Sequence, residues 1–144
     1  MKRADDSKIY LTIIIVPLVI AAILGGISLY SIMIVEPKAK ALINSEESKS
    51  MKEGYLILRR AELFGGFNHW DFDGDVVRKS IKHFDKEIYK GTELEKNDRR
   101  YLNEILARRE SGSNLGIKTS LFLLIVSFAG FAAYIFERRG VVEK

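Results

Sequence analysis

The stretch IYLTIIIVPLVIAAILGGISLYSIMIV, from Ile9 to Val35, decides the fold of this 144-residue chain. It holds 27 consecutive positions without an Asp, Glu, Lys, Arg or His. As a helix it would be about 40 Å long, which exceeds the roughly 30 Å of a bilayer's hydrocarbon core. The apolar region of a secretory signal peptide is much shorter, about 7–15 residues. The sequence therefore predicts an uncleaved transmembrane helix over residues 9–35.

A second apolar run, TSLFLLIVSFAGFAAYIF, covers residues 119–136 and is also free of charged residues. Its 18 positions would span about 27 Å as a helix, which is enough to cross a bilayer. The average composition, 47% hydrophobic and 29% charged, hides this segregation of apolar from charged residues. We predict an all-α integral membrane protein in which two transmembrane helices flank residues 36–118.

The short tails outside the two runs carry basic residues that predict the orientation. They are Lys2, Arg3, Lys8, Arg138, Arg139 and Lys144. Short loops rich in Lys and Arg stay on the cytoplasmic side of a membrane. We therefore expect tails 1–8 and 137–144 to be cytoplasmic, in the cell membrane, and residues 36–118 to be extracytoplasmic. Tyr10 and Tyr134 would then lie at the same membrane interface.

Small residues recur at four-residue spacing in both predicted spans. They are Ala21, Ala22, Gly25, Gly26, Ala129 and Ala133, with Ser127 and Gly130 nearby. In lipid, small residues let helix backbones approach closely, and this contact replaces the hydrophobic driving force that is missing there. Two interpretations remain open: the two spans pack on each other, or the small residues form a docking surface for helices of another subunit.

The segment between the spans shows three amphipathic patterns, which predict a domain of roughly three helices. Pro37 suits the first turn of a helix, so the first span is expected to continue outward. The first pattern places Met51, Tyr55 and Leu58 in one row and ends at Gly65-Gly66. The second places Val77, Ile81, Phe84 and Ile88 on one face, between a cap at Asp73 or Asp75 and a stop at Gly91.

The third amphipathic pattern is predicted to begin at a capping box formed by Thr92 and Glu95. Its apolar face comprises Leu94, Tyr101, Leu102 and Ile105. Residues 111–114, Ser-Gly-Ser-Asn, have the composition of a flexible joint, which we expect between this helix and the second span.

The loop around residues 67–75 concentrates the residue types that bind metal ions. Asp71, Asp73 and Asp75 alternate as at the start of an EF-hand loop, but that loop wants Gly and Glu where this chain has Val76 and Lys82. The favoured interpretation is that the acids cap the next helix. A looser cation site, or a transition-metal site that adds His69 and His83, remains as an alternative.

Several functional classes are disfavoured by what the sequence lacks. There are no cysteines, and no nucleophile elbow, phosphate-binding loop or HExxH motif, so we expect neither an enzyme nor a bound cofactor. The net charge of +4 is not gathered into a stripe like those that bind nucleic acid. Neither span carries an ionisable group, which disfavours a self-sufficient pump.

The remaining classes all place the chain in a membrane. The leading hypothesis is a non-catalytic accessory subunit whose spans contact lipid and the helices of other integral membrane subunits. Small subunits of membrane oxidases, monooxygenases and other respiratory assemblies are similar in size and topology. The alternatives are a homo-oligomeric two-span channel subunit and a membrane-anchored extracytoplasmic metal-binding module.

Overall fold

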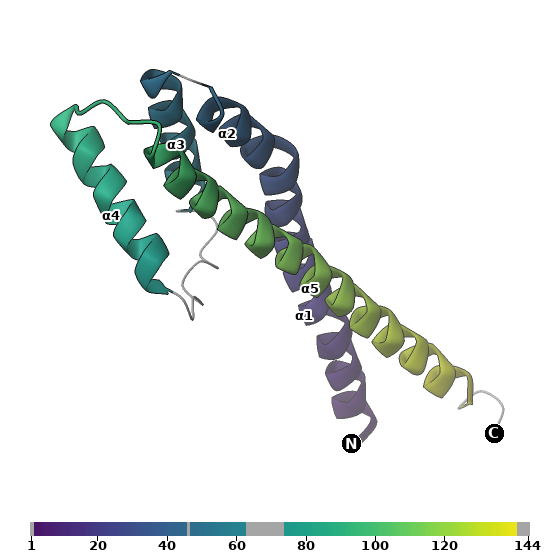
Figure 1. Ribbon diagram of the computed structural model, residues 1–144. Helices are drawn as coiled ribbons and strands as arrows, with labels where there is room; N and C mark the ends of the chain where they lie inside the picture. The colour runs from purple at the N-terminus through teal and green to yellow at the C-terminus, as the bar shows by residue number, and fades with distance from the viewer. Residues whose placement is uncertain (1, 46, 63–73, 141–144) are drawn as a thin grey trace. The chain divides into compact units, whose positions relative to one another are not determined.

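The computed structural model describes residues 2–45, 47–62 and 74–140, and the regular structure in these ranges is helical (Figure 1). A π-helical turn, η1, follows α1 without a break and leads directly into α2. The elements are α1 (Lys2–Tyr30), η1 (Ser31–Val35), α2 (Glu36–Ile43), α3 (Ser48–Glu62), α4 (Gly74–Lys90) and α5 (Asp98–Gly140). The expected continuation of the first span beyond Pro37 is confirmed.

The chain divides into two compact units. Unit 1 comprises residues 1–28 and 115–144, and unit 2 comprises residues 29–114. Two helical stretches, Lys8–Ile43 and Asp98–Arg139, are long and apolar enough to cross a membrane. Only 11% of the most apolar window in each is buried, whereas the core helix of a soluble protein would be mostly buried. The predicted architecture of two long apolar helices flanking shorter ones is therefore confirmed.

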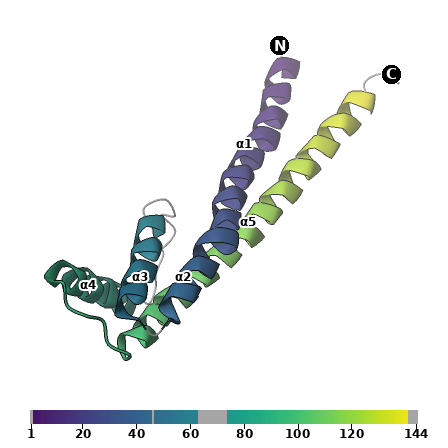
Figure 2. The same cartoon turned by 90° about the horizontal axis from the view of Figure 1, so that it is seen from above.

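Unit 2 is built around a core to which α2, α3, α4 and the first turns of α5 contribute (Figure 2). Met51, Tyr55 and Leu58 are each at most 3% exposed, as their helical spacing predicted. Phe84 of α4 is fully buried, and Ile88 packs against the same core. Val77, predicted for the same face, lies in the first turn of α4. The buried members are Ala39, Ile43, Met51, Tyr55, Leu58, Phe84, Leu94, Leu102 and Leu106.

Polar contacts fix the packing of α4 on α3. The hydroxyl of Tyr55 lies 2.7 Å from Oδ1 of Asp85 and 3.2 Å from the carbonyl oxygen of Ile81. Arg59 extends this contact, with its guanidinium 3.4 Å from the other carboxylate oxygen of Asp85. A buried tyrosine needs a partner for its hydroxyl, and Asp85 supplies one that also carries charge.

The end of α4 follows the sequence prediction. Gly91 has φ +73°, a left-handed conformation that glycine adopts without steric cost. Its N–H donates to the carbonyl of Ile88, and the N–H of Thr92 donates to the carbonyl of Glu87, both at 3.1 Å. These two hydrogen bonds form a Schellman motif, which satisfies carbonyls at the end of α4.

The capping box predicted at Thr92 and Glu95 is wrong, because α5 begins six residues later, at Asp98. The intervening chain brings Leu94 into the core, where it is 5% exposed and its N–H donates to the hydroxyl of Ser48 at 2.8 Å. The side chain of Asp98 accepts from the N–H of Glu95 at 2.8 Å. Tertiary contacts of Leu94 thus override the local capping signal.

The flexible joint predicted at residues 111–114 is also wrong, because α5 runs through it without interruption. Gly and Ser disfavour a helix by at most about 1 kcal/mol per residue. Each residue that extends an existing helix adds a hydrogen bond without a new nucleation cost. Leu106 before the segment and Ser120 after it are both buried, so packing holds both flanks in helical register.

Two glycine-to-alanine substitutions should shift stability in opposite directions, although open space surrounds both glycines. Gly91→Ala should lower the free energy of unfolding by about 1 kcal/mol, because alanine is strained at positive φ. Gly112→Ala should raise it by up to about 1 kcal/mol, because position 112 lies inside a continuous helix. Denaturant unfolding of the full chain in detergent micelles measures both. If Gly112→Ala does not raise the free energy of unfolding, the flexible joint expected at residues 111–114 would be supported instead.

Candidate functional site

Two serines of α5 join it to α1 inside unit 1. The hydroxyl of Ser120 donates to the carbonyl of Ala21, and that of Ser127 donates to the carbonyl of Ile14, both at 2.8 Å. Both serines are buried, as is Ala21. Such hydrogen bonds require the two backbones to be close, and in lipid they are worth about 0.6 kcal/mol each. We call this α1–α5 contact the seam.

Glycines in the seam face the opposite helix at close range. A Cβ placed on Gly25 would lie 2.7 Å from Oγ of Ser120, and one placed on Gly130 would lie 3.1 Å from Cγ2 of Ile13. A Cβ on Gly116 would overlap the hydroxyl of Ser28. A side chain at these positions would require Ser120, Ser28 or Ile13 to shift. Four predicted packing residues therefore lie in the seam: Ala21, Gly25, Ser127 and Gly130.

The other four predicted packing residues do not lie in the seam. Ala22, Gly26, Ala129 and Ala133 are all exposed on the outer surface of unit 1. A Cβ placed on Gly26 would meet nothing within 4 Å. The structure thus divides one sequence pattern into an inner set, which the chain uses itself, and an outer set, which the chain leaves uncovered.

Sequence reasoning missed three seam residues, Ser28, Gly116 and Ser120. The signal that identifies them is a seven-residue interval. Ser113, Ser120 and Ser127 recur at that interval along α5 and all are buried. On α1, Ala21 and Ser28 have the same spacing, and both are buried. A seven-residue period keeps one narrow face of a helix turned toward its partner, which the four-residue pattern alone does not specify.

A chain of polar side chains lies where η1 meets α2 in unit 2. Nε of Arg109 donates to the hydroxyl of Ser31 at 2.9 Å, and that hydroxyl donates to Oε1 of Glu36, also at 2.9 Å. Ser31 is 2% exposed and Glu36 is 7% exposed. A buried carboxylate needs such partners, because desolvation without them is costly. The three residues bind α5 to the end of the first long helix.

The π-helical turn is what brings Ser31 and Glu36 together. Residues five apart stack on one face of a π-helix, and the backbone N–H of Glu36 bonds to the carbonyl of Ser31. In an α-helix, residues four apart would occupy these places. π-turns occur mostly as single turns and frequently at functional sites, so Ser31, Glu36 and Arg109 form the candidate functional site of unit 2. The spacing of apolar residues in the sequence could not reveal this site, because the π-turn inserts one extra residue into the helical period between Ser31 and Glu36.

The predicted acidic loop falls largely outside the described residues. His69, Asp71 and Asp73 lie outside the described residues. Asp75 lies inside α4, which begins at Gly74, so Asp75 is not the residue that precedes the helix. Within residues 2–45, 47–62 and 74–140, no three His, Asp or Glu side chains are grouped as metal ligands would be. The metal-binding alternative stays a prediction.

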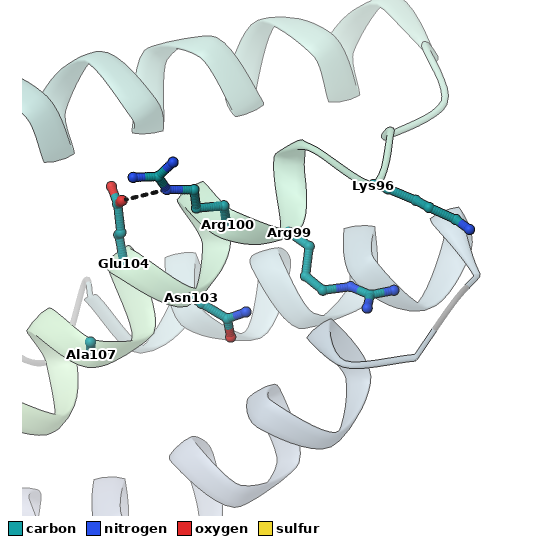
Figure 3. A pocket seen from close by; sticks show the side chains of 6 residues that line it. All are labelled: Lys96, Arg99, Arg100, Asn103, Glu104 and Ala107. Carbon is teal, nitrogen blue, oxygen red and sulfur yellow. Dashed lines mark ion pairs between the residues drawn. The ribbon is translucent and has the colours of Figure 1, made fainter.

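A shallow hollow of about 540 Å³ lies beside the start of α5 (Figure 3). Its lining residues are Lys96, Arg99, Arg100, Asn103, Glu104 and Ala107. Two of its basic side chains already have partners. Arg100 forms an ion pair with Glu104 at 3.6 Å, and Arg99 donates a hydrogen bond to the carbonyl of Ser45 at 3.3 Å.

Comparison with known proteins adds no relative. No protein-family model, no curated protein and no solved structure matches this chain. Functional inference therefore depends on the geometry of the two units.

The stability cost of a one-residue deletion should distinguish the π-turn from ordinary α-helix. Deletion of Met33, which is 72% exposed, should convert η1 to an α-turn and keep Ser31 stacked on the glutamate. The free energy of unfolding should change by less than about 1 kcal/mol. The control is deletion of Gly112 in α5, which turns the helix by about 100° and should cost about 3 kcal/mol. Denaturant titration in micelles measures both, and equal losses would contradict the π-turn explanation.

Proposed function

We propose that the chain is a two-span membrane protein that serves as a non-catalytic accessory subunit of a larger membrane complex. Its long apolar helices would cross the bilayer, contacting lipid on one side and helices of integral membrane partners on the other. Respiratory assemblies such as membrane oxidases and monooxygenases contain small subunits of this type, and a complex of that kind is the proposed setting.

The outer set of small residues carries the proposal. Ala22 and Gly26 on α1, and Ala129 and Ala133 on α5, are exposed although both helices have a complete seam of their own. Lipid tails gain nothing from small side chains, whereas a partner helix can approach such positions closely. Surface of this kind on a chain whose spans are already paired fits a protein that docks on others.

Unit 2 supports a bracing role. Its core joins α2, α3 and α4 to the first turns of α5, and the polar chain of Ser31, Glu36 and Arg109 secures the end of the first long helix. A unit with a buried core of its own suits a subunit that holds partner domains in place.

The proposed orientation places both tails in the cytoplasm and unit 2 outside. The chain has no cysteine of its own, so single cysteines report without background. Cysteine at Thr92, which is exposed, should react with an impermeant thiol reagent in intact cells. Cysteines at Lys2 and Lys144 should react only after the membrane is opened. Labelling confined to the tails would reverse the orientation.

The outer small residues should decide partner binding. Gly26→Leu and Ala133→Leu should each reduce the partner proteins recovered after gentle detergent extraction, because bulk blocks close helix approach while insertion into the membrane persists. The matched control is Ile20→Leu, an exposed apolar change on α1 that alters little volume. Quantitative mass spectrometry of the purified complex measures recovery.

Three outcomes of this purification are informative. A stoichiometric set of larger membrane proteins that is depleted by Gly26→Leu supports the accessory subunit. A ring of this chain alone would support the homo-oligomeric channel instead. If recovery is unchanged in Gly26→Leu and in Ala133→Leu, the outer small residues face lipid. The proposal would then lose its main support.

A further inference from the structure

We propose that the outer face of α4 docks on an acidic surface of a protein partner. Lys82, Lys86 and Lys90 follow one another at four-residue spacing on α4, the teal helix of Figure 1, and all three are exposed. Lys79 continues the same face one turn earlier. At 100° per residue these lysines and Tyr89 fall within an arc of about 100°. We call this set, Lys79, Lys82, Lys86, Tyr89 and Lys90, the lysine face.

The lysine face lies opposite the side of α4 that forms the core. Phe84 is fully buried, and it is turned about 160–200° from Lys82 and Lys86 on the helix. The carboxylate of Asp85 lies on the side of α4 that faces α3, where it contacts Tyr55 and Arg59. Asp85 is therefore committed to α3 and does not neutralise the lysine face.

Lys79 makes an interaction of its own, whereas the other three lysines of this face lack carboxylate partners within the described part of the chain. Lys82, Lys86 and Lys90 take part in none of its ion pairs. Like charges at four-residue spacing on a helix repel one another, which disfavours the arrangement when it stands alone. An acidic surface laid against α4 would turn that repulsion into attraction and steer the partner to this face.

Tyr89 is an independent sign of a protein contact. Its side chain is 93% exposed, in contrast to Tyr55, which is 1% exposed in the core of the same unit. Tyrosine is enriched at protein interfaces, where its ring supplies rigid contact area and its hydroxyl a hydrogen bond. An exposed ring within a row of lysines fits an interface that combines charge with one aromatic anchor.

A protein fits this face better than a lipid surface does. Basic amphipathic helices bind membranes by burying their apolar face among the acyl chains as well as by charge. In α4 that apolar face is already occupied, since Phe84 and Ile88 pack into the core. The lysines and Tyr89 are exposed on the opposite side and remain available to a partner. The inference rests on the proposed function, because the acidic surface would belong to a subunit that the spans bring alongside.

Photo-crosslinking tests the lysine face in the full chain within its native membranes. Tyr89 is replaced by p-azidophenylalanine, the membranes are irradiated, and crosslinked peptides are identified by mass spectrometry. We expect a crosslink to an Asp- and Glu-rich segment of a protein that also co-purifies through the spans. Its yield should fall about tenfold in the variant K82E/K86E/K90E and at high salt.

The matched control is K38E/K49E/K96E, which makes the same change in charge at exposed lysines elsewhere in unit 2. Its crosslink yield should stay within about twofold of the original. Docking through the lysine face would be contradicted if partners co-purify but position 89 gives no crosslink, or crosslinks only to lipid or to this chain. The proposed accessory-subunit function would not be affected by that result. Absence of any co-purifying protein would overturn the accessory subunit as well.

Discussion

Close approach of the backbones of α1 and α5 is the constraint on which the rest of the structure depends. In an apolar surrounding, apolar side chains give no preference for a helix over lipid, so contact must come from close packing and hydrogen bonds. Gly25, Gly116 and Gly130 create the space, and Ser120 and Ser127 fill it with hydrogen bonds to backbone carbonyls. At Gly25 the two effects are linked, because a Cβ there would meet the hydroxyl of Ser120 that makes the hydrogen bond.

The same requirement explains why polar groups change character along the two long helices. Inside unit 1 the seam uses hydroxyls, whose burial costs little when one carbonyl accepts the hydrogen bond. In unit 2 the connection includes charged side chains, since Arg109 and Glu36 both hydrogen-bond to the hydroxyl of Ser31. A charged side chain costs less there because Arg109 is only partly buried. The π-turn at Ser31–Val35 supplies the extra residue that aligns these groups.

Sequence patterns predicted the parts of the fold that depend on long or periodic signals. Both apolar helices, the buried row of Met51, Tyr55 and Leu58, and the stop at Gly91 are confirmed. The errors were local signals overridden by packing: Leu94 enters the core where a cap was expected, and α5 crosses the expected joint at 111–114. The polar chain of Ser31, Glu36 and Arg109 was not predictable, because its members are separated by up to 78 residues and aligned by a π-turn.

The division of the small residues bears on how a paired helix can also bind others. Had all eight predicted residues faced inward, none of them would be available to another helix. Instead Gly25 serves the seam while Gly26, one residue and about 100° away, faces outward. Adjacent glycines thus give one helix two faces for close approach. The outer small residues are exposed on both helices, and this exposure is the observation that supports the proposed contact with a partner helix.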